Sequence, residues 1–179
     1  MKIKESFINN EVWTLTFGAA FQRANIYTIL ANDKNKKVFK LETQSFVERD
    51  ILPLYRASLM KGDADHLENI QKISDYTEKF DGILNNGRLN FGVSQKILNL
   101  LLKYKWCIDD YPEPPHFPLD RRIQEILNLN PIISWTQITT SEEYMKIINK
   151  VRALKNDKTL AQFELEKFER RRNMGIKNI

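Results

Sequence analysis

Apolar residues recur every three or four positions over most of the chain, which is the spacing of helices that bury one face. This spacing predicts helices over residues 5–30, 38–52, 63–84, 94–107, 120–129, 140–153 and 158–172. Turn-forming stretches separate them, namely the polar run 32–37, Pro53, Lys61-Gly62-Asp63, Asn85-Asn86-Gly87 and Asn130-Pro131. No two segments make a convincing strand pair, so the predicted fold class is all-α. We expect a single compact all-helical domain over residues 1–179, or two lobes packed together.

The predicted helix over 94–107 is apolar around most of its circumference, which is typical of a helix in the middle of a molecule. Lys96, Asn99 and Lys103 recur at helical spacing and form one narrow polar stripe. An unpaired lysine in a core is costly, so the stripe must face a polar cleft, a partner or solvent. A lysine at the wall of a cleft loses its proton more easily and can then attack an electrophilic carbon. The alternative is a lysine at the helix edge whose amine reaches water.

A proline-rich loop follows the central helix and ends at Asp120. Four prolines between residues 112 and 118 predict extended backbone there. Asp120 can cap the next helix, as Ser94 can cap the central one. A carboxylate held by helix-start amides stays ionised and fixed in space, which suits a reaction that develops positive charge. Capping alone is the simpler interpretation, and the two roles are compatible.

The basic residues are concentrated at the C-terminal end. The chain of 179 residues has a formal net charge of +5. Residues 150–179 contain nine Lys or Arg, including Arg170, Arg171 and Arg172, against four acidic residues. Such a segment suits a polyanion such as nucleic acid, although a solvated helix face explains it as well.

Cysteine and histidine are scarce. One cysteine and two histidines exclude a disulfide framework within one chain and are too few for a typical zinc centre, so we expect no metal site and no cofactor. No apolar run is long enough to span a bilayer, and the first residues do not resemble a signal peptide. We therefore expect a cytoplasmic, monomeric protein with no membrane partner.

Residues 85–120 resemble the core of the helix-hairpin-helix DNA glycosylases, especially the oxoguanine-type and archaeal members. In that family a glycine-containing hairpin precedes a helix with the motif Gly-Val-x-x-Lys, and a loop then leads to Pro-x-Asp at the start of the next helix. This chain has Gly92-Val93-Ser94-Gln95-Lys96 and then Pro118-Leu119-Asp120. The family hairpin usually reads Leu-Pro-Gly-Val-Gly where this chain has Asn90-Phe91-Gly92-Val93-Ser94.

The resemblance implies a DNA glycosylase, with or without AP-lyase activity, that excises a damaged or modified base, with an oxidised purine as the first guess. Lys96 would attack the anomeric carbon of a flipped-out nucleotide, and Asp120 would stabilise the cationic sugar. The resemblance also implies a two-lobed helical fold with a helix-hairpin-helix element. The helix 94–107 and the loop 108–120 would then lie at the cleft.

An enzyme that flips a nucleotide also needs groups to hold the base and the DNA backbone. The candidates for base contact are His116, Phe117, Trp106, Gln22 and Arg23. The candidates for backbone contact are Gly92, Ser94, Lys103, Arg121 and Arg122. Core packing is the competing interpretation for each aromatic residue.

Two further functions are compatible with the sequence. One is a non-catalytic helical nucleic-acid-binding or phage-defence protein on the same scaffold. The other is an all-α adaptor whose tail folds on a protein partner.

Overall fold

The structure, a computed structural model, describes residues 2–59, 62–109, 111–155 and 157–168. The fold is all-α, as predicted. Among the described residues the only β-type pairing is an isolated bridge between Tyr27 and Leu84. The α-helices are α1 (Ile3–Phe21), α2 (Asp33–Phe46), α3 (Leu52–Arg56), α4 (Asp63–Tyr76), α5 (Phe91–Ile108), α6 (Arg121–Ile126), α7 (Ser141–Leu154) and α8 (Leu160–Lys167). The π-helix η1 (Val47–Ile51) and the 3-10 helices η2 (Thr77–Ile83) and η3 (Trp135–Gln137) complete the list.

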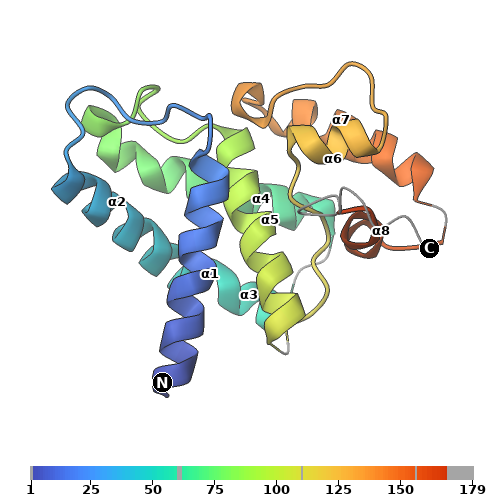
Figure 1. Cartoon of the computed structure of the whole chain (residues 1–179), viewed down its shortest axis with the longest axis horizontal. Helices are drawn as coiled ribbons and strands as arrows, with labels where there is room; N and C mark the ends of the chain where they lie inside the picture. Colours follow the sequence, from blue (N-terminus) through green and yellow to red (C-terminus); the bar gives the residue numbers. More distant parts are fainter. Residues whose placement is uncertain (1, 60–61, 110, 156, 169–179) are drawn as a thin grey trace, which may run out of the picture.

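Helix α5 is the centre of the arrangement. It packs against α1, α4 and η3, and Figure 1 shows α1 and α2 on one side of it and α6, α7 and α8 on the other. Most of its residues from Phe91 to Lys103 are buried, as its apolar circumference predicts. Its cap is not Ser94 as expected but Asn90, whose side chain accepts a hydrogen bond from the amide of Val93 at 2.8 Å. The helix therefore begins a turn earlier than predicted.

The predicted helix over 5–30 is wrong in its last third. Helix α1 ends at Phe21, and Arg23 and Asn25 have positive φ angles of 64° and 41°. The chain then runs beside the end of η2, where Thr28 N donates to Ile83 O at 3.0 Å. Ile29 is consequently exposed rather than buried on a helix face.

The sequence predicts that a helix ends before Pro53, but the helical chain continues through this residue. It lies in the first turn of α3, where its missing N–H costs nothing, and the chain reaches it through the π-turn η1. The predicted cap at Asp120 is confirmed, because its side chain accepts a hydrogen bond from Ile123 N at 3.0 Å. The helix predicted over 140–153 begins with a capping box between Thr140 and Glu143. Residues 169–172 of the last predicted helix lie outside the described residues, as do Arg170, Arg171 and Arg172 of the basic segment.

Candidate functional site

Lys96 and Asp120 meet at the junction of α5 and α6. The Lys96 Nζ lies 3.5 Å from Asp120 Oδ2, and the side chains are 4% and 22% exposed. Lys96 is in the second turn of the buried helix α5, while Asp120 is fixed by its capping bond to α6. Asp120 Oδ1 therefore accepts the capping hydrogen bond of α6, and Asp120 Oδ2 faces the Lys96 amine.

Burial and the neighbouring groups act on the pKa of the Lys96 amine in opposite directions. Its Nζ is 3.7 Å from the centroid of the Trp135 ring, a contact that favours the charged form. Burial is the main cause that lowers the pKa of Lys96 below its usual value, and the positive charge of Arg23 lowers it further. The carboxylate of Asp120 acts in the opposite direction. The arrangement provides an amine that gives up its proton more readily than a surface lysine and has a carboxylate beside it.

Lys96 and Asp120 line a cavity of about 530 Å³. The other lining residues come from α1 and its C-terminal turn, α5, α6 with the residues before it, η3 and the C-terminal segment: Ala19, Gln22, Arg23, Leu100, Lys103, Tyr104, Pro118, Arg121, Arg122, Trp135, Glu164 and Phe168. Seven residues chosen from the sequence thus share one cavity, namely Gln22, Arg23, Lys96, Lys103, Asp120, Arg121 and Arg122. Segments far apart in the chain contribute them, so the cavity is a property of the tertiary fold.

Lys103 makes a buried ion pair at the wall of this cavity. Its Nζ lies 3.0 Å and 2.7 Å from the two carboxylate oxygens of Glu164 in α8. The Glu164 side chain is 2% exposed, and burial raises its pKa above the usual value. The Phe168 ring covers the pair, with its centroid 4.3 Å from Lys103 Nζ. Sequence reasoning missed Glu164, although a lysine on the stripe of a buried helix does call for a buried carboxylate partner.

Gly92 and Ser94, the helix-start residues expected to contact phosphates, are both buried. The amide of Gly92 donates to Ile138 O at 2.9 Å, and Ser94 is fully buried. A β-carbon at Gly92 would come within 1.8 Å of Trp135 O, so this glycine serves close packing against η3.

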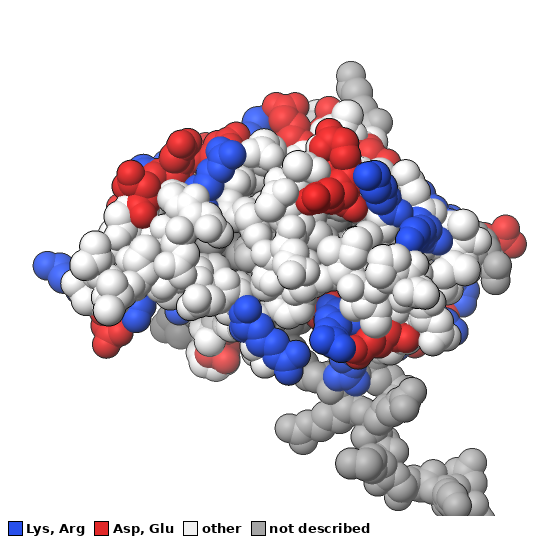
Figure 2. Space-filling view, turned by 90° about the horizontal axis from the view of Figure 1, so that it is seen from above, with Lys and Arg blue, Asp and Glu red and all other residues white. Residues whose placement is uncertain are grey.

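Figure 2 shows the molecule turned by 90° from Figure 1 and seen from above. Uncharged residues occupy the centre of this face, and most charged side chains lie toward its rim.

His116 and Phe117, which were expected to contact the base, are 0% and 1% exposed and do not line the cavity. They belong to the core, and Phe117 is part of the hydrophobic cluster. Trp106, which is half-buried, does not line the cavity of Lys96 and Asp120. Of the five residues expected at the base, Gln22 and Arg23 alone line it.

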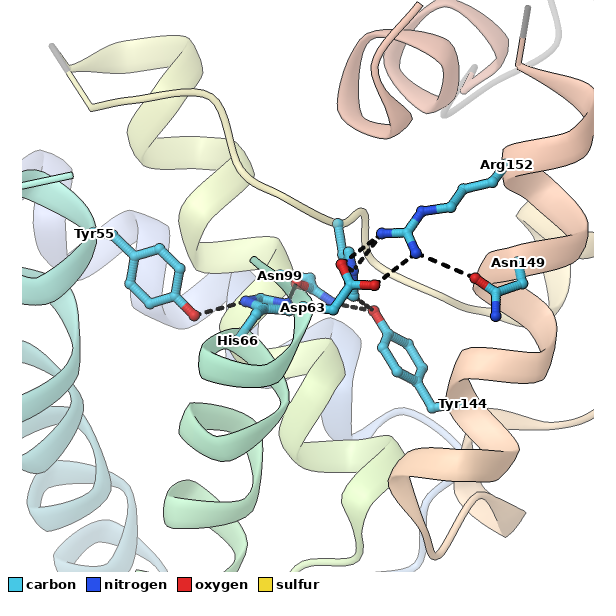
Figure 3. A network of polar contacts seen from close by, with 8 residues as sticks. Tyr55, Asp63, His66, Asn99, Tyr144, Asn149 and Arg152 are labelled. Carbon is cyan, nitrogen blue, oxygen red and sulfur yellow. Dashed lines mark hydrogen bonds and ion pairs between the residues drawn. The ribbon is translucent and has the colours of Figure 1, made fainter. Parts of the chain in front are cut away.

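Figure 3 shows a network of polar contacts that joins α3, α4, α5 and α7, and His116 of the proline-rich loop takes part in it. Its Nδ1 shares a hydrogen bond with Tyr144 Oη at 3.1 Å, and its Nε2 lies 3.0 Å from Asp63 Oδ1. Arg152 holds the same carboxylate through two bonds of 2.5 Å and 2.6 Å. Burial lowers the pKa of His116 to about 4, which outweighs the opposing effect of Asp63. The imidazole is therefore neutral at pH 7.

Asn99 connects this network to the loop before Asp120. Its Nδ2 donates to Tyr144 Oη and to Gln95 Oε1, both at 3.0 Å, and its Oδ1 shares a 2.9 Å hydrogen bond with His66 Nε2. The predicted stripe on α5 therefore has two functions. Lys96 and Lys103 line the cavity, whereas Asn99 joins the structural network.

Among the described residues, no group of three or more His, Cys, Asp or Glu side chains could hold a metal ion. None of the helices in the described part of the chain has the length and apolarity needed to cross a membrane. A comparison of the chain with protein-family models, curated proteins and solved structures finds no match.

Proposed function

We propose that the chain is a DNA glycosylase in which Lys96 is the nucleophile and Asp120 its electrostatic partner. The observation that carries the proposal is the 3.5 Å approach of the Lys96 amine to the Asp120 carboxylate at the wall of a cavity. The motif resemblance nominated both residues, and the fold brings them together from two helices. The helices on either side of α5 agree with a two-lobed arrangement around such a cleft.

The proposed reaction begins with the neutral amine of Lys96 attacking C1′ of a flipped-out nucleotide. The C1′–N bond breaks, and the base leaves with the bonding electrons and takes up a proton. The carboxylate of Asp120 stabilises the positive charge that develops on the sugar, because it is fixed beside the amine before the reaction begins. Loss of a proton from the attached nitrogen and opening of the sugar ring then give a Schiff base.

The Schiff base has two possible fates. Water can hydrolyse it, which frees Lys96 and leaves an abasic site. Alternatively, removal of a C2′ proton expels the 3′-phosphate and cuts the strand, which is the AP-lyase reaction. Both outcomes pass through the same covalent adduct, so the adduct is the species to detect.

The cavity suits an extruded base in size and polarity. Its volume of about 530 Å³ lies in the range of small-molecule sites. The buried pair of Lys103 and Glu164 offers a donor beside an acceptor, and Gln22 offers both. An oxidised purine such as 8-oxoguanine presents a carbonyl next to an N–H and can pair with this arrangement, as can any other base edge with the same two groups.

Trapping with sodium borohydride tests the proposal, since the reagent reduces a Schiff base to a stable adduct. The protein is incubated with duplexes carrying 8-oxoguanine, other oxidised bases or an abasic site, and adducts are resolved on a denaturing gel. We expect a covalent complex that Lys96→Gln abolishes. Lys72→Gln is the matched control, because Lys72 is an exposed residue of α4 that pairs with Glu68. The same gel shows whether the strand is cut.

Failure to trap any adduct across this panel would overturn the proposal. Salt-dependent DNA binding without an adduct would instead favour the non-catalytic nucleic-acid-binding protein. Absence of DNA binding at low salt would favour the adaptor.

A further inference from the structure

A shallow depression on α1 joins the cavity of Lys96 to a second hollow between α1 and α2. Thr14 and Gly18 line both the depression and the hollow. Ala19 and Gln22 line both the depression and the cavity. The three concave regions therefore adjoin one another along α1, and we name them together the α1 groove. Figure 1 shows α1 between α2 and α5, so the groove crosses the face of α1 from one to the other.

The α1 groove has a positively charged wall and an uncharged floor. Lys36, Lys37 and Lys40 of α2 line its outer end, together with one acidic residue, Asp33. Helix α1 has no charged residue from Val12 to Gln22. Leu15 and Leu41, which line the groove, are 42% and 52% exposed. Lysines beside exposed apolar surface suit a chain with phosphates on one side and bases on the other.

We propose that the α1 groove holds a single strand of DNA that leads into the cavity of Lys96. The strand phosphates lie along Lys36, Lys37 and Lys40, and the bases face Leu15, Leu41 and the floor formed by α1. The identification of the strand as DNA rests on the proposed function, whereas the charge of the groove and the adjacency of its three regions do not. The groove accounts for the exposure of Leu15 and Leu41, which the chemistry of Lys96 leaves unexplained.

Gly18 lies where two of the concave regions meet and provides the first test. A β-carbon at Gly18 would have no atom within 4 Å, so a larger side chain projects into the groove without disturbing the core. We expect Gly18→Gln to weaken binding of a fluorescein-labelled oligothymidylate about tenfold, because the larger side chain occupies the space of the strand. Gly18→Ala is the matched control, which makes the same gain in helix propensity but leaves the groove open.

The lysine wall provides the second test. The triple variant Lys36→Gln, Lys37→Gln, Lys40→Gln removes three candidate phosphate contacts. Each phosphate contact of a single strand contributes about 0.7 to the slope of log K against log salt, so we expect the slope to fall by roughly 2. The control triple Lys72→Gln, Lys146→Gln, Lys158→Gln makes the same change of net charge at exposed lysines outside the groove.

The two tests separate this inference from the proposed function, because oligothymidylate carries no lesion and needs no chemistry at Lys96. Loss of binding in the groove variants, with no adduct on damaged DNA, retains the groove and removes the glycosylase. Normal binding by Gly18→Gln and by the groove triple would overturn the groove, whatever the trapping result. Equal loss in the two lysine triples would also overturn it, since net charge alone would then explain the binding.

Discussion

The side-chain amide of Gln95 forms hydrogen bonds with both the backbone N–H and the backbone C=O of Leu119, and we call this pair of bonds the clasp. Gln95 Nε2 donates to Leu119 O at 2.9 Å, and Leu119 N donates to Gln95 Oε1 at 3.2 Å. Gln95 is the residue before Lys96, and Leu119 is the residue before Asp120. The clasp therefore fixes the two backbones that carry the amine and the carboxylate, and it is fully buried.

Gln95→Leu is expected to lower the free energy of unfolding by roughly 3 kcal/mol. The substitution leaves the Leu119 amide and carbonyl buried without these partners, and the penalty for such groups exceeds the value of the bonds themselves. Urea denaturation monitored by tryptophan fluorescence measures the change. Gln71→Leu, at a surface-accessible glutamine of α4 that donates to Asp75, is expected to change stability by less than about 0.5 kcal/mol. Similar values for the two variants would show that the clasp contributes little.

Gly92 and Gly18 are both helical glycines, but the space around them differs. A β-carbon at Gly92 would lie 1.8 Å from Trp135 O and 2.8 Å from Trp135 C, which are backbone atoms that cannot rotate away. Gly92→Ala is therefore expected to cost roughly 3 kcal/mol or more, and to separate η3 from α5. Gly18→Ala is expected to stabilise the protein by up to about 1 kcal/mol, because it meets open space. Thermal unfolding of both variants measures the contrast, and a destabilised Gly18→Ala would contradict it.

The helices that were predicted well are those whose signals are local. Asp120 caps its helix as expected, and Thr140 caps α7 where a helix was predicted to begin, because capping depends on a side chain and an amide three residues away. The apolar circumference of α5 also predicted its central position. The end of α1 was missed, because the turn at Arg23 and Asn25 depends on pairing with residues 83–85, which lie far away in the sequence.

In the candidate site, too, residues with a local sequence signal were predicted, and residues placed by contacts far apart in the sequence were missed. Lys96 and Asp120 were found through a motif, and they do lie together. Glu164 was missed because nothing near it in the sequence distinguishes it from the neighbouring acidic residues of the last helix. His116 was misplaced because a histidine in a proline loop resembles a surface residue. Its partners Asp63, Tyr144 and Arg152 come from two other helices and are brought together only by the fold.

The stability of the protein is expected to fall between pH 6.5 and pH 4. Burial lowers the pKa of His116 from 6.5 to about 4, so within this window the unfolded chain binds a proton that the folded protein excludes. The contribution is fully present above pH 6.5 and lost as the pH falls, to a total on the order of 3 kcal/mol at 1.36 kcal/mol per pH unit. Burial also lowers the pKa of His66, which acts in the same direction.

Urea unfolding between pH 7 and pH 4.5 measures this dependence. The carboxylate of Asp63 does not interfere, because Arg152 holds its pKa below the usual value and its contribution is lost only at more acidic pH. His116→Gln is the comparison variant, since its amide can replace bonds to Tyr144 and Asp63 but does not titrate. We expect a shallower slope in this variant. An equal free energy of unfolding at pH 7 and pH 5 in the wild type would contradict the prediction that the buried neutral histidines make stability fall with pH.

Asp120→Asn separates the capping role of this residue from its electrostatic role. Asparagine caps helices about as well as aspartate, so the helix start is retained, and any loss of stability comes from the buried Lys96 amine losing its charged partner. The carboxylate that raises the pKa of Lys96 is lost, however, so that pKa should fall further below its usual value. The amount of borohydride-trapped adduct should drop at least about tenfold, since the charge that stabilises the sugar cation is gone. The acidic limb of its pH profile should move to lower pH, since the amine now becomes neutral at lower pH. Asp120→Ala, which also removes the cap, should lose about 1 kcal/mol of stability in addition.

An Asp120→Asn protein that forms the adduct at the wild-type rate and with the wild-type pH profile would leave Asp120 as a helix cap alone.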